Sequence, residues 1–176
     1  MSALERWEGR LAGALDGIAI LLMATLVVVI AWSVLGRQVL RISVPWAEEV
    51  GAGLLVWMVA LGAAAVWQRR GHIVIDVLLN RLALRPRFVL VIAIELASLL
   101  LLAVALWGSW SMMFVSAHNR TTALGISYTW LYLALVAGLG AMILFSLSWL
   151  GRLLVRGPAM LAAARRGDEW STLSSS

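Results

Sequence analysis

Two adjacent carboxylates, Glu48 and Glu49, stand at the start of a long apolar run, in the stretch VPWAEEVGAGLLVW at positions 44–57. Paired carboxylates could perform acid–base chemistry, but that chemistry needs further groups to complete the site, and none is adjacent. Neighbouring helical residues also point about 100° apart, which disfavours one shared proton. Two other interpretations remain. The pair is either an acidic helix start after Pro45, favoured by the helix dipole, or a contact with a partner protein, anchored by Trp46.

A second polar group lies in the segment RRGHIVIDVLLNRLALRPR at 69–87. Its apolar residues recur at helical spacing and form a stripe of Ile75, Leu78, Leu79 and Leu82. The pattern predicts a short amphipathic helix over about 72–84, which lies at the membrane surface with its arginines towards anionic lipid headgroups. His72 and Asp76 share another face of this helix. They are either part of a plain interfacial helix or a polar contact to a partner.

Glu95 falls inside the third apolar run, Phe88–Ala117. If residues 96–115 fill the hydrocarbon, Glu95 lies at the inner membrane edge near the arginines; the alternatives are a buried functional carboxylate or a pair within a subunit interface. The two histidines, His72 and His118, are expected on opposite sides of the membrane. They therefore cannot bind one haem within a single chain, although a partner's histidine could complete such a site. We predict no catalytic residue, cofactor site or metal site.

The composition indicates the elements that carry these residues. The chain has 176 residues, of which 62% are hydrophobic and 13% charged, and it has no cysteine. Lipid is the solvent that suits such a composition, and no polar domain is present for nucleic acid. We predict one all-α domain over 1–156, followed by a cytoplasmic, partly disordered tail over 157–176. The four predicted transmembrane helices cover about 17–36, 50–67, 93–115 and 128–150.

The arginines orient these four spans. With an even number of spans, the two termini and the middle loop share one side. That side carries eleven arginines: Arg6, Arg10, Arg69, Arg70, Arg81, Arg85, Arg87, Arg152, Arg156, Arg165 and Arg166. The opposite side carries Arg37, Arg41 and Arg120. The bias predicts a multi-pass membrane protein with both termini in the cytoplasm.

Small residues at four-residue spacing mark possible helix-packing faces, where backbones approach closely. They are Gly9, Gly13 and Gly17 before and at the start of the first span, Ala60 and Ala64 in the second, and Ala134 and Gly138 in the fourth. The spacing does not say whether they meet helices of this chain or of another. Neither proline nor dense glycine interrupts a span at its middle, which argues against an independent carrier with its own binding site.

The stretch GRQVLRISVPWAEEVGAGLLVWMVALGAAAVWQRRGHIVIDVLLNRL resembles the small membrane subunit of tripartite ATP-independent periplasmic (TRAP) transporters, the DctQ-like family. The resemblance depends on Arg37, Trp46, Glu48 and Glu49, followed by LGAA at 61–64, the arginine pair, and His72 with Asp76. A weaker similarity lies in ALGISYTWLYLALVAG at 123–138. Ser127 and Val136-Ala137 stand where the family often has proline.

The resemblance implies a complex of three components. A periplasmic binding protein captures an organic acid, such as a dicarboxylate, keto acid or sialic-acid-like compound, and a large permease subunit moves it with sodium. The small subunit is then a non-catalytic scaffold, and the six residues Arg37, Trp46, Glu48, Glu49, His72 and Asp76 are candidate partner contacts. Two alternatives stay open: a membrane anchor of a respiratory oxidoreductase, and the small subunit of a tricarboxylate-type tripartite transporter.

Overall fold

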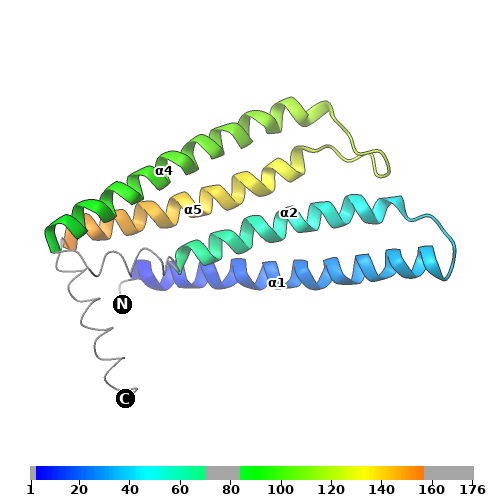
Figure 1. Ribbon diagram of the computed structural model, residues 1–176, viewed down its shortest axis with the longest axis horizontal. Helices are drawn as coiled ribbons and strands as arrows, with labels where there is room; N and C mark the ends of the chain where they lie inside the picture. The colour runs from blue at the N-terminus through cyan, green and yellow to red at the C-terminus, as the bar shows by residue number, and fades with distance from the viewer. Residues whose placement is uncertain (1–2, 70–83, 157–176) are drawn as a thin grey trace, which may run out of the picture.

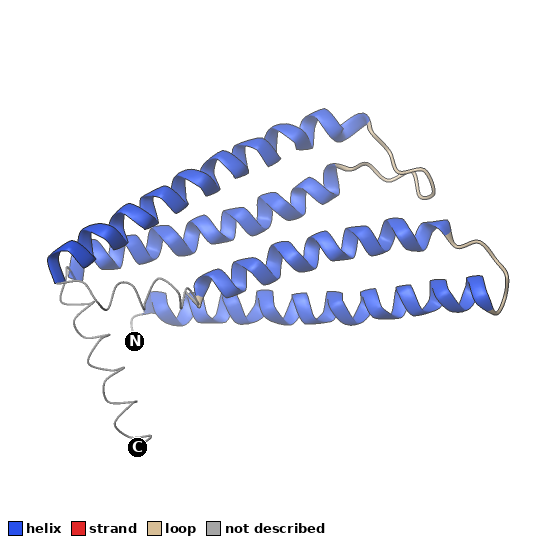
Figure 2. Ribbon diagram, viewed as in Figure 1, coloured by secondary structure: helices blue, strands red, loops and turns tan. Residues whose placement is uncertain are grey.

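The computed structural model describes residues 3–69 and 84–156 (Figure 1). This part of the chain is helical and contains no β-strand, as Figure 2 shows. Its elements are α1 (Ala3–Gln38), α2 (Pro45–Gln68), α4 (Leu84–Val115), the short 3-10 helix η1 (Ser116–His118) and α5 (Thr129–Arg156). The predicted interfacial helix over 72–84 and the tail over 157–176 lie outside the described residues, except that Leu84 begins α4.

The four long helices follow from the need to satisfy every backbone polar group within hydrocarbon, where water is absent. The shortest, α2, has 24 residues. At 1.5 Å per residue it is about 36 Å long, which exceeds the roughly 30 Å hydrocarbon core. Within the described residues, four helices are long and apolar enough to cross a membrane. This confirms the predicted all-α membrane fold with four spans.

The helices lie side by side in the order α4, α5, α2, α1 (Figure 1). Each hairpin, α1–α2 and α4–α5, is antiparallel, whereas α2 and α5 run in the same direction where the hairpins meet. Only 6% of the apolar stretch of α1 is buried within this chain, compared with 28% for α2. The outer helix α1 therefore exposes most of its apolar surface, which lipid or another protein must cover.

The contact between α2 and α5 depends on small residues. Ala60, Ala64 and Ala134 are 8%, 0% and 0% exposed. Gly138 is also buried, and a Cβ built on it would lie 2.6 Å from the carbonyl oxygen of Ala60. Only glycine permits this approach of the two backbones.

Three tryptophans and a serine extend the same contact along the helices. A Cβ on Gly53 would overlap the ring of Trp130, and the ring centroids of Trp57 and Trp130 are 6.3 Å apart. Further along, Trp67 Nε1 donates a 2.8 Å hydrogen bond to Ser146 Oγ. Small-residue packing and the Trp67–Ser146 hydrogen bond thus hold α2 against α5.

Candidate functional site: the two polar ends of the helix layer

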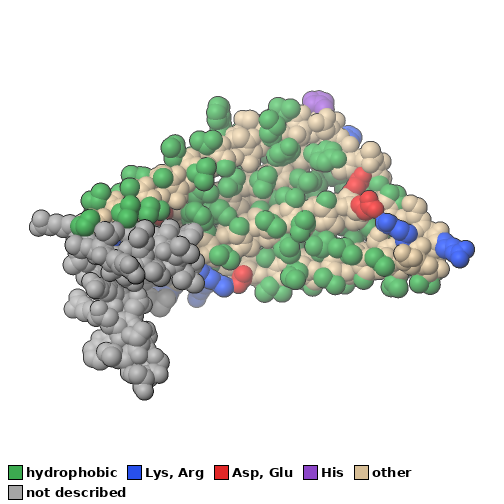
Figure 3. Space-filling model, viewed as in Figure 1, with side chains coloured by type: hydrophobic (Ala, Val, Ile, Leu, Met, Phe, Trp, Pro, Cys, Tyr) green, Lys and Arg blue, Asp and Glu red, His purple; other side chains and the backbone are tan. Residues whose placement is uncertain are grey.

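Polar side chains gather at the two ends of the layer, as Figure 3 shows for its loop end at the right of the view. We define the loop end as the α1–α2 turn (39–44), the α4–α5 loop (116–128) and the adjoining helix ends. The terminal end carries the start of α1 and the end of α5. Of the six candidate partner contacts, Arg37, Trp46, Glu48 and Glu49 lie together at the loop end. His72 and Asp76 lie outside the described residues.

Glu48 reaches back to α1. Its Oε1 accepts a 2.9 Å hydrogen bond from Arg37 Nη2, and the two side chains are 71% and 59% exposed. Exposed ion pairs of this kind contribute about 0–1 kcal/mol, because water and salt screen both charges. The pair can therefore exchange partners at little loss of stability.

Glu49 reaches in a different direction, to the α4–α5 loop. It accepts hydrogen bonds from the backbone amides of Ala123 (2.6 Å) and Leu124 (2.9 Å), and from the hydroxyl of Thr122 (3.1 Å). Neighbouring residues on a helix point about 100° apart, which explains why one carboxylate meets α1 and the other meets the loop. Glu49 thus joins the start of α2 to a loop that lies more than seventy residues further along the chain.

The α4–α5 loop, which Glu49 binds, is also stabilised by a turn and by hydrogen bonds of its own. Gly125 has a φ of +66°, a conformation that glycine adopts without a steric penalty. The backbone N–H of Thr121 donates to Ile126 O at 2.8 Å, and Arg120 Nη1 donates to Gly125 O at 3.0 Å. Leu124 and Ile126 remain 41% and 44% exposed. The loop is therefore ordered by internal hydrogen bonds while presenting apolar side chains outwards.

Two hollows open at the loop end beside Arg37 and Glu48. The first, which we call the α1–α2 groove, has a volume of about 520 Å³. Its lining is mostly apolar and comprises Leu26, Ile30, Ser33, Val34, Arg37, Gln38, Ala47, Glu48, Gly51, Ala52 and Leu55. The second, the turn pocket, has a volume of about 600 Å³ and is lined by Arg37, Arg41, Ile42, Ser43, Val44, Pro45 and Glu48.

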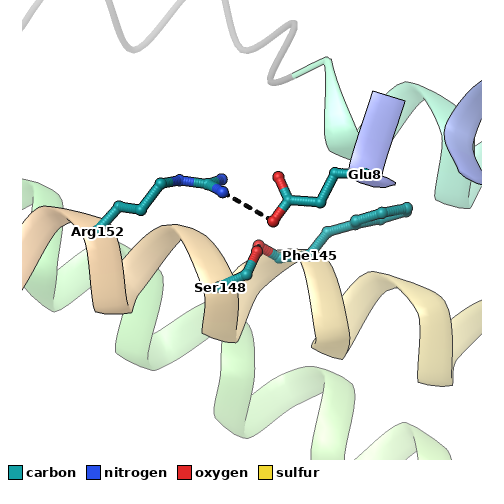
Figure 4. Close-up of polar contacts among 4 residues, drawn as sticks. All are labelled: Glu8, Phe145, Ser148 and Arg152. Atoms are coloured by element: carbon teal, nitrogen blue, oxygen red, sulfur yellow. Dashed lines mark hydrogen bonds and ion pairs between the residues drawn. The ribbon is translucent and has the colours of Figure 1, made fainter. Parts of the chain in front are cut away.

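The terminal end carries a different kind of ion pair. Glu8 Oε1 accepts a 2.7 Å hydrogen bond from Arg152 Nη1, and the two side chains are only 6% and 19% exposed (Figure 4). Phe145 and Ser148 of α5 flank the pair in the same view. Arg69 and Asp16 form a second ion pair between α2 and α1. These contacts close the layer where the first and last helices approach.

Sequence reasoning did not single out Glu8 or Arg152. The available signal was a carboxylate before the first span and an arginine after the fourth, both expected on one side of the membrane. Glu95 is also buried, at 6% exposure, in α4. Among the described residues, no group of three His, Asp or Glu side chains could hold a metal ion.

The predicted packing residues divide into two groups. Ala60, Ala64, Ala134 and Gly138 lie in the α2–α5 contact described above. In contrast, Gly9, Gly13 and Gly17 are exposed, and a Cβ on any of them would meet nothing within 4 Å. The glycine stripe of α1 thus packs against no helix in the described part of this chain.

Four membrane-length helices, with charged contacts gathered at their ends, define a multi-pass membrane protein. The family model for the DctQ component of tripartite ATP-independent periplasmic transporters matches residues 4–156, so the chain belongs to the DctQ family. It is a small permease subunit, which is a component of a transporter and not an enzyme. Membership in this family implies a large permease subunit and a binding protein as partners.

Two relatives agree with this family. The sialic acid TRAP transporter small permease protein SiaQ of Vibrio cholerae is 28% identical over 121 residues, which cover 69% of this chain and 70% of that protein. A Haemophilus influenzae protein, whose name assigns it provisionally to the TRAP transporter small permeases, is 23% identical over 123 residues. Those residues cover 70% of this chain and 74% of that protein.

Proposed function

We propose that this subunit is a non-catalytic scaffold for the large permease subunit in sodium-coupled uptake of an organic acid. The acid, a dicarboxylate, keto acid or sialic-acid-like compound, is delivered by a periplasmic binding protein. The name of the Vibrio cholerae relative favours the last of these substrate classes. The small subunit widens the static membrane surface against which the large subunit moves.

One observation carries this proposal: the charged side chains that pair within the described chain bind one another across helix boundaries. Arg37–Glu48 and Asp16–Arg69 join α1 to α2, and Glu8–Arg152 joins α1 to α5. Between the two ends, the contact of α2 with α5 is filled by alanine and glycine. This arrangement suits a rigid brace, because its polar groups stabilise the layer.

The loop end supplies a surface for a partner outside the membrane. Trp46 is 38% exposed and lies three residues before Glu49, so both occupy one face of α2. Glu49 holds the loop that presents Leu124 and Ile126. We propose Trp46 and these two loop residues as the apolar contact with a partner protein, because exposed aromatic and aliphatic side chains commonly anchor interfaces. His72 and Asp76 remain proposed partner contacts at the opposite membrane face, and Arg37 and Glu48 are treated separately below.

We propose that the loop end lies outside and the termini inside an inner membrane, an orientation that the arginine distribution supports. The chain has no cysteine, so single-cysteine variants test this orientation directly. In intact cells, Ala117→Cys at the exposed loop end should react with a membrane-impermeant maleimide. Ser175→Cys in the tail should react only after lysis. Equal labelling of Ser175→Cys before and after lysis would reverse the orientation.

Reconstitution tests the scaffold function. Sealed vesicles should hold this subunit alone, the large subunit alone, or both, with the binding protein, a radiolabelled organic acid and an inward sodium gradient outside. We expect accumulation only with both membrane subunits present. Accumulation by this subunit alone would refute the scaffold proposal, and undiminished accumulation by the large subunit alone would show that the scaffold is dispensable.

A further inference from the structure

The α1–α2 groove and the turn pocket adjoin each other, because Arg37 and Glu48 line both, and we call the two together the hollow. The groove follows α1 from Leu26 to Gln38. Twelve residues of helix rise about 18 Å, close to half of the roughly 30 Å hydrocarbon core. The groove is thus about one leaflet deep, apolar along its length and charged at its mouth.

The charged mouth has unused hydrogen-bond donors. Arg37 donates one N–H group to Glu48, whereas its guanidinium has five N–H donors in all. Arg41 is exposed and lines the turn pocket without a hydrogen-bond or ion-pair partner among the described residues. Its backbone has a φ of +54°, a left-handed conformation that is uncommon outside glycine and that concentrates at functional sites. Two guanidinium groups therefore border one pocket and suit a phosphate.

Glu48 adds an opposite charge beside them. Its Oε1 is bonded to Arg37, while the described chain supplies no partner for Oε2. A primary ammonium carries three N–H donors and could bond that oxygen. An acidic segment of a partner protein would match the arginines but would leave the apolar groove unfilled. The arginines suit a phosphate, Glu48 suits a primary ammonium and the apolar groove suits an acyl chain. A phospholipid with an ethanolamine headgroup has all three groups.

We propose that this hollow binds one phosphatidylethanolamine molecule. Its acyl chain lies in the α1–α2 groove, its phosphate contacts Arg37 and Arg41, and its ammonium contacts Glu48. The site is a feature of the small subunit itself and does not depend on which organic acid the transporter moves. The lipid would cover part of the apolar surface that α1 leaves exposed.

Native mass spectrometry of the full-length chain tests the proposal. The protein is delipidated in detergent and titrated with phosphatidylethanolamine, phosphatidylcholine and phosphatidylglycerol of identical acyl chains. We expect one phosphatidylethanolamine to bind about tenfold more tightly than phosphatidylcholine, whose quaternary ammonium has no N–H for Glu48. Glu48→Gln should abolish this preference. Equal binding of the two lipids by the wild-type chain would overturn the proposal.

Two pairs of matched variants test the other contacts. Arg41→Gln removes a charge without removing a contact within the described chain, and should weaken binding of all three lipids about tenfold. Its control, Arg120→Gln, makes the same change at the same end but outside the hollow. Ala52→Phe should fill the groove and block binding, whereas Ala63→Phe, on an exposed position of the same helix, should not. Circular dichroism and gel filtration establish that each variant is folded.

The variants also distinguish the alternative occupant. If Arg41→Gln and Arg120→Gln bind every lipid equally, the proposal is wrong. If Arg41→Gln instead releases the large subunit or the binding protein from the lipid-free complex, the hollow belongs to a protein segment, and the proposal is likewise overturned. Because Arg41→Gln should fold normally, these outcomes remain decisive even if Ala52→Phe does not fold.

Discussion

The two ends of the helix layer use similar residues for different purposes. At the terminal end, the buried Glu8 and the half-buried Arg152 join the first helix to the last. At the loop end, Arg37 and Glu48 are mostly exposed and join neighbouring helices that a six-residue turn already connects. Burial decides the difference, because a buried charge that loses its partner cannot be rehydrated, whereas an exposed one can. The Glu8–Arg152 pair therefore holds the layer together, whereas the Arg37–Glu48 pair can bind a further partner.

The largest effect should come from breaking the buried pair. Glu8→Ala or Arg152→Ala should each destabilise the chain by about 3–5 kcal/mol, since either breaks an ion pair that is largely withdrawn from water. Replacing both residues by leucine should restore much of the loss. Thermal unfolding in detergent of the wild type, the two alanine variants and the Glu8→Ala/Arg152→Ala double variant forms a double-mutant cycle. Additive effects of the two alanine variants would show that the pair does not act as a unit.

A somewhat smaller effect is expected in the contact between the two hairpins. In Gly138→Ala, the new methyl group would lie 2.6 Å from the carbonyl oxygen of Ala60, and α2 and α5 must separate. Overpacking of this kind typically costs about 1–3 kcal/mol. Gly140→Ala, two residues along the same helix, meets nothing within 4 Å and is the matched control. Equal melting temperatures of the two variants would contradict the close approach.

At the loop end, the effect of Glu49→Gln should be local. The neutral amide accepts weaker hydrogen bonds from Ala123 and Leu124, so the loop should open more often. Hydrogen exchange at those two amides should accelerate several-fold while exchange within the helices stays unchanged. Glu48→Gln is the control, because Glu48 does not touch the loop. Equal acceleration in both variants would remove the distinction between the two carboxylates.

The smallest effect on stability is expected for the exposed pair. Arg37→Gln should lower the free energy of unfolding by about 0–1 kcal/mol. The loss should shrink further in high salt, because the Debye length falls to about 3 Å at 1 M. Denaturation at low and high ionic strength measures it. A loss as large as that of Arg152→Ala would show that both ends are structural.

Much of the fold was predictable because it depends on local properties of the chain. Each apolar run is long enough to span hydrocarbon, and Pro45 and the arginines mark where spans begin and end. The positions of the small residues were equally visible, but their partners were not. Gly9 with Gly13 and Ala60 with Ala64 have the same spacing, yet only the second pair is buried within this chain. Spacing specifies a helix face and not the element that covers it.

The sequence by itself determined an all-helical, four-span membrane protein and most of the residues at its loop end, because hydrocarbon imposes length and polarity on each segment separately. Only the tertiary structure decided that Glu48 meets Arg37, that Glu49 holds a loop more than seventy residues away, and that Glu8 meets Arg152 across 144 positions. It also decided that α5 packs beside α2, which brings Ala60 against Gly138. Such contacts depend on how whole helices pack in the membrane. When several helices have similarly apolar surfaces, the sequence of one helix does not show which of the others it will contact.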